Sequence, residues 1–118
     1  MGVFTVPIQV GDPGAERFES FEALVDTGSS NTAVPGSVLR ALGVEPYRTA
    51  MFEMADGSQA PMEIGRTWVR VNGDIELTQV VFSEEGSQPI LGAITLEELG
   101  LGVDPIKRQF VPVRRLRI

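Results

Sequence analysis

The 118-residue chain contains no cysteine and no histidine. Without cysteine, the chain has no disulfide, no thiolate nucleophile and no cysteine-bound metal, and a reducing compartment is allowed. Without histidine, Ser-His and Cys-His catalysis and the usual zinc sites are excluded too. Acid–base chemistry near neutral or acid pH must therefore use carboxylates, and we expect neither a metal nor another cofactor.

Long apolar runs are also missing. No stretch approaches the roughly 20 residues that a membrane-spanning helix needs, and no charged-then-apolar leader is visible. We therefore expect a cytoplasmic protein without a membrane span, unless the sequence is one domain of a longer protein. The formal net charge of −6 argues against nucleic-acid binding.

Basic residues are few and unevenly spread. Half of the ten lie in the segment 107–118, namely Lys107, Arg108, Arg114, Arg115 and Arg117. The plainer interpretation is a solvated terminal strand. The functional alternative is a binding site for an acidic partner.

With 42% hydrophobic residues, the chain can bury a core, and we expect one domain over 1–118. Stretches of β-branched and alternating apolar residues, separated by turn residues, predict a mostly β fold. Asn72-Gly73 predicts a type I′ hairpin turn, and Ala55-Asp56-Gly57 a tight turn that a plain hairpin would also form in the type I′ geometry. The predicted strands cover 3–10, 17–25, 47–54, 62–71, 75–82, 90–92 and 110–118.

Two short helices are expected as well. Ser37 is predicted to cap a helix over 38–42. Thr95 and Glu98 have the spacing of a capping box for a second helix, which ends at Gly100.

The sequence also contains two segments that resemble each other. Segment 39–46 resembles 96–105, and each is preceded by a short apolar strand with a glycine turn, at 24–28 and 90–92. Similar capping chemistry on two unrelated helices would explain this. We favour a domain built from two related halves around a pseudo-twofold axis.

Asp26 is the candidate catalytic residue. An apolar strand delivers it into the turn Asp26-Thr27-Gly28-Ser29. Gly28 lets its N–H approach a carboxylate closely, and Ser29 can donate a further hydrogen bond to the same group. Such donors favour the charged form of a carboxylate and hold it in place.

One carboxylate does not suffice to hydrolyse an amide without a metal or a nucleophile. One group must deprotonate water while another protonates the substrate. Two carboxyls that share one proton do both, because their mutual repulsion raises the pKa of one of them. The chain has a single Asp-Thr-Gly, and Ile90-Leu91-Gly92 in the second half carries no Asp. We therefore expect the second Asp26 to come from another copy across a twofold axis.

Together these motifs resemble the retropepsin-like family of aspartic peptidases, the retroviral-type proteases with cellular and bacterial members. Segment 24–30 resembles the active-site turn, the hairpin 51–65 the flap, and 89–92 the apolar-apolar-Gly segment behind the turn. The resemblance implies a closed, barrel-like β domain that forms a homodimer.

The resemblance also implies residue roles. Asp26 would be catalytic, Thr27 would interlock with its symmetry mate, and Gly28 would hydrogen-bond the carboxylate. Substrate would bind as an added strand. The supporting positions are Ser29 in the turn, Ala55, Asp56 and Gly57 at the flap tip, and Ile90, Leu91 and Gly92 behind the site.

Two positions depart from the viral pattern. Many viral members have an acidic residue where this chain has Asn31 and an arginine where it has Ala93, and these residues form an ion pair. The flap is also not rich in glycine. Both differences place the chain nearer the cellular or bacterial branch.

Three functional hypotheses are compatible with these features. The leading hypothesis is a homodimeric aspartic endopeptidase that acts on a peptide or protein substrate. The main alternative is a non-enzymatic retropepsin-like module for dimerisation or peptide binding. A carboxylate glycosidase is a weaker third, because no pair of Asp or Glu residues stands out in a strand-end setting.

Overall fold

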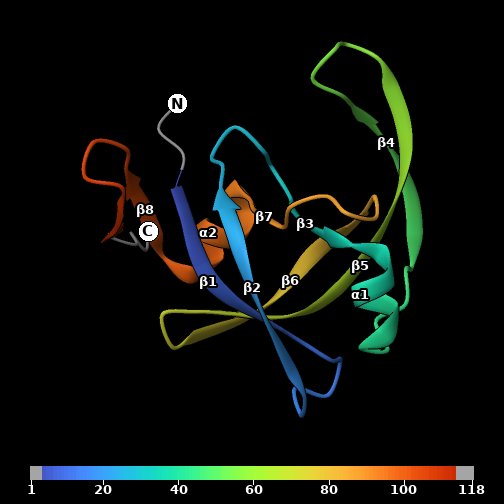
Figure 1. Cartoon of the computed structure of the whole chain (residues 1–118), viewed down its shortest axis with the longest axis horizontal. Coiled ribbons are helices and arrows are strands. Elements are labelled where there is room, and N and C mark those ends of the chain that lie inside the picture. The colour runs from blue at the N-terminus through green and yellow to red at the C-terminus, as the bar shows by residue number, and fades with distance from the viewer. Residues whose placement is uncertain (1–3, 114–118) are drawn as a thin grey trace, which may run out of the picture.

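The computed structural model describes residues 4–113, which form a mostly β domain with two short helices, as predicted (Figure 1). The elements, in chain order, are β1 (Phe4–Gly11), β2 (Phe18–Val25), β3 (Thr32–Pro35), α1 (Gly36–Ala41), β4 (Arg48–Glu53), β5 (Gln59–Val71), β6 (Asp74–Ser83), β7 (Ile90–Leu91), α2 (Ala93–Leu99), β8 (Leu101–Asp104) and β9 (Gln109–Pro112). Neither helix has the length and apolar character needed to cross a membrane within this part of the chain.

Seven strands make one sheet in the order β1-β2-β7-β3-β6-β5-β4. The sheet curls so that β1 also pairs with β5, through Gln9 opposite Arg70 and Val10 opposite Val69. The β4–β5 hairpin extends away from the rest of the domain (Figure 1). A core of mainly aliphatic side chains lies against the curled sheet and both helices; it contains Ile8, Val10, Ala23, Val25, Val34, Leu39, Leu42, Val44, Val69, Val71, Val80, Phe82, Leu91, Leu96 and Leu99.

The strand pairing has the connectivity of two related halves. Strand β2 runs parallel to β7 and β3 runs parallel to β6, while β3–β7 and β1–β5 are antiparallel. Exchanging β1, β2, β3 and α1 for β5, β6, β7 and α2 reproduces the same set of pairs, except that β4, which pairs with β5, has no counterpart. The counterpart of β7 is therefore β3, so the predicted match between 24–28 and 90–92 was wrong. The loop 84–88 occupies the place of the Asp26 turn in the second half.

Strand β3 was not predicted, because its four residues lie inside a segment rich in turn formers. Its Val34 is completely buried, and it pairs on both sides, with β6 and with β7. Tertiary pairing therefore overrides the local turn signal.

The cap of the first helix was predicted wrongly. Helix α1 begins at Gly36 with Pro35 at the N-cap position, and this N-cap residue makes no side-chain hydrogen bond to the helix. Ser37 lies inside the first turn and donates its amide and its hydroxyl to the carboxylate of Glu85. This acceptor is 48 residues away in sequence, so the local pattern could not reveal it.

The capping box of the second helix was also wrong. Helix α2 begins at Ala93 with Gly92 at the N-cap position, and again no side chain caps it. Its first amides donate instead to main-chain oxygens of the Asp26 turn: Ala93 N to Ser29 O at 2.8 Å and Ile94 N to Ser30 O at 2.9 Å. Thr95 lies within the helix and is fully buried.

The two hairpin turns differ. Asn72 and Gly73 have φ of 52° and 85°, which confirms the predicted type I′ turn. In the β4–β5 hairpin only Gly57 has positive φ, at 87°, and its amide donates to Met54 O at 2.9 Å. This turn is the longer kind with glycine in the left-handed position, so the type I′ assignment there was wrong.

The C-terminal part of the described chain is a separate two-stranded sheet of β8 and β9. Strand β8 was not predicted. Strand β9 ends at Pro112, as expected for a proline at an edge or a break, whereas the predicted strand continued to 118. Lys107 and Arg108 are exposed in the connecting turn, and Arg114, Arg115 and Arg117 lie outside the described residues.

Candidate active site

Asp26 directly follows the buried end of β2. Val25 pairs with Leu91 of β7, and both side chains are essentially inaccessible. The main chain continues this pairing into the turn, because Leu24 N donates to Pro89 O at 2.9 Å and Asp26 N to Leu91 O at 3.1 Å. The backbone of Asp26 is therefore fixed by a buried parallel strand pair.

The carboxylate of Asp26 is half-buried and accepts a hydrogen bond from Gly28 N at 2.9 Å. Within residues 4–113 this is its only hydrogen bond. The predicted bond from the Ser29 hydroxyl is not formed; Ser29 N donates instead to the main-chain oxygen of Asp26 at 3.1 Å. Thr27 and Gly28 are exposed in the single chain.

Gly92 marks the closest approach behind the turn. A Cβ atom at this position would lie 2.4 Å from the carbonyl carbon of Asn31, 2.5 Å from its oxygen and 2.9 Å from Thr32 N. Its φ of −95° suits any residue, so space and not conformation requires glycine here. The segment 90–92, which comprises β7 and Gly92, thus packs directly against the segment that follows Asp26.

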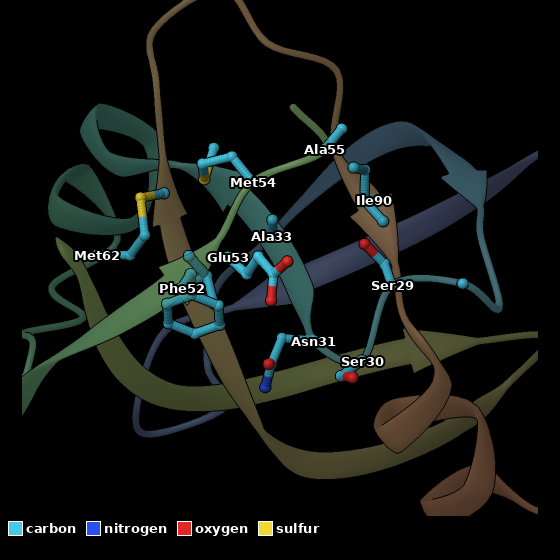
Figure 2. Close-up of a pocket in the computed structure, with 12 residues that line it drawn as sticks. Ser29, Ser30, Asn31, Ala33, Phe52, Glu53, Met54, Ala55, Met62 and Ile90 are labelled. Carbon is cyan, nitrogen blue, oxygen red and sulfur yellow. The ribbon is translucent and has the colours of Figure 1, made fainter. Parts of the chain in front are cut away.

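A groove of about 550 Å³ lies beside the turn (Figure 2). In Figure 2, Phe52 and Met62 lie on one side of the groove and Ser29 and Ile90 on the other. The lining is mainly apolar and comes from the turn, from β3, β6 and β7, and from the hairpin: Gly28, Ser29, Ser30, Asn31, Ala33, Phe52, Glu53, Met54, Ala55, Met62, Val81 and Ile90.

The hairpin contributes one face to this groove. Phe52 lies opposite Ala60, and Met62 lies opposite Ala50, and all four side chains are partly buried. The alternate residues of β4 are exposed. Sequence reasoning did not single out Phe52 or Met62, although the apolar residues at 50, 52 and 54 carried the period-2 signal.

At the hairpin tip, Ala55 lines the groove, whereas Asp56 and Gly57 do not. The hydroxyl and the amide of Ser58 donate to Asp56 Oδ1, at 2.6 and 2.9 Å. These two bonds hold the pKa of Asp56 below its ordinary value, and the bond from the hydroxyl has the larger effect. Asp56 therefore organises the tip as a charged Asx-type turn.

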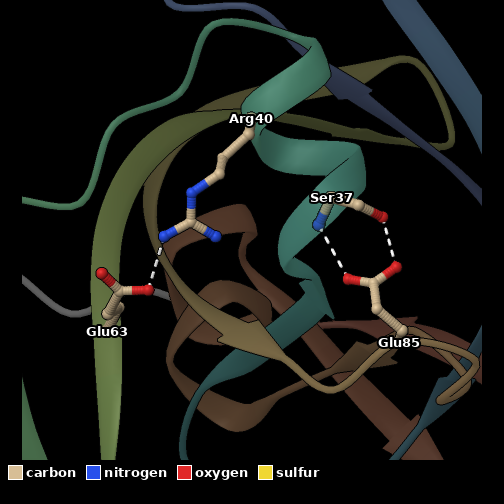
Figure 3. Close-up of polar contacts among 4 residues, drawn as sticks. All are labelled: Ser37, Arg40, Glu63 and Glu85. Carbon is tan, nitrogen blue, oxygen red and sulfur yellow. Dashed lines mark hydrogen bonds and ion pairs between the residues drawn. The ribbon is translucent and has the colours of Figure 1, made fainter.

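The base of the hairpin is tied to α1 (Figure 3). Arg40 Nη2 lies 2.5 Å from Glu63 Oε1 in β5, and its guanidinium stands 4.9 Å from the centre of the Phe82 ring. One turn earlier, Ser37 holds Glu85 of the 84–88 loop, and its hydroxyl and amide lower the pKa of that carboxyl. Helix α1 thus links the hairpin to the pseudo-symmetric counterpart of the Asp26 turn.

Known structures share this fold. The Simian Foamy Virus (mac) protease has a TM-score of 0.55 at 19% identity, and the match covers 80% of this chain and 94% of that one. The EIAV protease, solved with the inhibitor HBY-793, has a TM-score of 0.59 at 17% identity, covering 82% and 88%. A retropepsin-like aspartic protease from Rickettsia conorii has a TM-score of 0.53 at 17% identity, covering 86% of each chain. These similarities confirm the retropepsin-like fold.

The sequence supports the same assignment. A comparison with curated proteins gave no significant match. The model of one protein family, described as "gag-polyprotein putative aspartyl protease", matches residues 17–98. This segment includes the Asp26 turn, the β4–β5 hairpin, β7 and most of α2. The chain therefore belongs to the gag-polyprotein aspartyl protease family.

Proposed function

We propose that this chain is one half of a homodimeric aspartic endopeptidase and that residues 1–118 form its single domain. Asp26 of one copy would face Asp26 of a second copy across a twofold axis. The observation that carries the proposal is the setting of Asp26: its backbone is fixed on β7, and its carboxylate accepts from Gly28 N at 2.9 Å.

Within the part of the chain that the structure describes, the pseudo-symmetric counterpart of the Asp26 turn offers no carboxylate held in this way. The loop 84–88 is the counterpart of the Asp26 turn, but its Glu85 accepts two hydrogen bonds from Ser37 at the start of α1. A second copy supplies the missing group. Thr27 is exposed in the single chain, which leaves its hydroxyl available to a symmetry mate.

In such a pair, one carboxylate is ionised and the other holds the shared proton. The ionised carboxylate takes a proton from a water molecule as the water oxygen bonds to the peptide carbon. The protonated carboxyl gives its proton to the carbonyl oxygen. Collapse of this tetrahedral intermediate breaks the C–N bond. The carboxyl that took the water proton gives it to the leaving nitrogen, and the other carboxylate takes a proton from a hydroxyl of the intermediate, which restores the starting pair.

The substrate would be an extended peptide between the turn and the β4–β5 hairpin, which we propose as the flap. The main-chain groups of Gly28 and of the tip residues Ala55, Asp56 and Gly57 would bind the peptide backbone. The apolar lining from Phe52, Met54, Met62, Val81 and Ile90 favours apolar substrate side chains in this groove.

The test is cleavage of a diverse peptide library by the purified chain at mildly acid to neutral pH. We expect specific cuts that a statine-type transition-state mimic blocks. Asp26→Asn keeps the side-chain shape and should abolish cleavage while the oligomeric state, measured by sedimentation, stays the same. Dimers that bind peptides without cutting them would support the non-enzymatic alternative, and undiminished cleavage by Asp26→Asn would refute the role of Asp26.

A further inference from the structure

Three buried threonines form a hydrogen-bonded chain behind the Asp26 turn. Thr32 at the start of β3, Thr78 in β6 and Thr95 in α2 are each 0% exposed. Thr32 Oγ1 lies 2.6 Å from Thr95 Oγ1, which lies 2.9 Å from Thr78 Oγ1. The chain starts at Gly92 N, 3.1 Å from Thr32 Oγ1, and ends at Glu98 Oε1, 2.6 Å from Thr78 Oγ1.

The two ends give this chain a direction. Each threonine hydroxyl has one proton to donate. Thr78 donates its proton to the Glu98 carboxylate, so Thr95 must donate to Thr78. Thr95 has then used its proton, and Thr32 must donate to Thr95. The oxygen of Thr32 accepts from the amide of Gly92, which can only donate. Every proton therefore points away from the Asp26 turn and toward Glu98.

The first bond of the chain acts at the crossing that holds Asp26. Gly92 follows Leu91, whose carbonyl accepts from Asp26 N at 3.1 Å. A Cβ atom on Gly92 would clash with the main chain of Asn31 and Thr32, so the two segments are in close contact there. The Thr32 hydroxyl thus bonds one crossing segment to the other at this contact.

Hydroxyls in this place have a cost that apolar side chains would avoid. A buried hydroxyl without a partner is unfavourable, and valine has nearly the same shape as threonine. The three threonine hydroxyls avoid this penalty, because no buried side-chain nitrogen or oxygen in residues 4–113 lacks a hydrogen-bond partner. A complete polar network in a low-dielectric core holds its members in one arrangement more firmly than apolar packing does.

We infer that Thr32, Thr95, Thr78 and Glu98 are positioning residues for the reaction, because together they fix β7 against the turn that carries Asp26. The inference rests on the proposed function for its effect on rate. The hydrogen-bond chain itself is independent of that function.

Thr95→Val tests the middle of the chain. It keeps the side-chain volume, but it removes the acceptor for Thr32 and the donor for Thr78. We expect kcat for a cleaved peptide to fall by about tenfold or more with KM nearly unchanged, since small displacements of a reacting group cost this much. Thr95→Ser restores the hydroxyl and should recover most of the loss.

Thr67→Val is the matched control. Thr67 is equally buried and lies opposite Thr78 in the β5–β6 register. Its hydroxyl donates to Gly11 O and takes no part in the hydrogen-bonded series of threonines. Its loss should lower thermal stability as Thr95→Val does, with kcat kept. If the two variants lower stability alike and neither changes kcat, the threonine chain is only structural and the inference is wrong.

NMR amide shifts separate the inference from the proposed function. Thr95→Val should move the amide signals of Gly92, Asp26 and Gly28, and Thr95→Ser should return them. If the wild-type chain cleaves no peptide, the proposed function fails, and these shifts alone decide whether the network positions the turn. Glu98→Ala, which removes the last acceptor from a partly exposed site, serves the same measurements if Thr95→Val does not fold. Unmoved amide signals in a folded variant would overturn the inference.

Discussion

Gly92→Ala tests how closely β7 supports the Asp26 turn. The added Cβ would lie 2.4 Å and 2.5 Å from the carbonyl carbon and oxygen of Asn31. Normal contact needs more than 3.4 Å for such atoms, and the obstacle is main chain, which cannot rotate away as a side chain would. The two segments must therefore move apart by roughly 1 Å, and overpacking of this kind costs about 1–3 kcal/mol or more.

A smaller effect acts in the opposite direction. Alanine restricts the unfolded chain and contributes about 0.4–1 kcal/mol where the native φ and ψ suit it. Gly92 has φ −95° and ψ 173°, which alanine adopts without strain. The clash is the larger effect, so we expect a net loss of about 1–2 kcal/mol in the free energy of unfolding.

Urea unfolding at one fixed protein concentration measures this loss, because association would otherwise contribute. Gly14→Ala is the matched control, since its Cβ would meet nothing nearer than 3.9 Å. We expect Gly14→Ala to match the wild type or to exceed it by up to about 1 kcal/mol, because only the restriction of the unfolded chain acts there. Equal stability of Gly92→Ala and Gly14→Ala would refute the close approach behind the turn.

Two further predictions concern the polar contacts of α1. Ser37→Ala should raise the pKa of Glu85 toward its ordinary value, as followed by NMR titration of the side-chain carboxyl. Because the folded state lowers this pKa, its contribution to stability is present above the unfolded-state pKa and is lost as the pH falls through the folded value. The variant should lose part of this dependence, since the amide at position 37 still donates to Glu85. Arg40→Ala should destabilise by no more than about 1 kcal/mol, because Arg40 and Glu63 are 52% and 44% exposed. A loss above about 2 kcal/mol in urea unfolding would contradict this estimate.

Local chemistry in the sequence predicted much of the fold. The Asn72-Gly73 turn formed as expected, because both residues tolerate positive φ. The alternating strands on either side of it formed as well, with β5 longer than predicted. The apolar strand before Asp26 and the Ile90-Leu91-Gly92 segment also lie in the interior as expected, because their own apolar composition favours burial.

Other features depend on contacts between distant segments. Both helix caps were predicted wrongly because the groups that bind the first amides of α1 and α2 lie in loops far away in sequence. Strand β3 exists because β6 and β7 flank it, and not because its residues favour a strand. Thr95 looked like a cap but is a buried link in the hydroxyl chain.

The candidate site shows the same division. The sequence indicated Asp26, Gly28 and the hairpin through short motifs. It did not indicate that Phe52 and Met62 would line the groove. The β4–β5 register decides which side of the hairpin they occupy, and the position of the hairpin beside the turn decides that this side lines the groove.

The central claim is that Asp26 is half of a site that a second copy completes. Mixing wild-type chains with Asp26→Asn chains at constant total concentration tests it most directly, after the subunits have exchanged. If each site needs two Asp26 residues, activity follows the square of the wild-type fraction, and an equal mixture retains about a quarter of the activity. An equal mixture that retains half of the activity would show that each chain works alone and would contradict the claim.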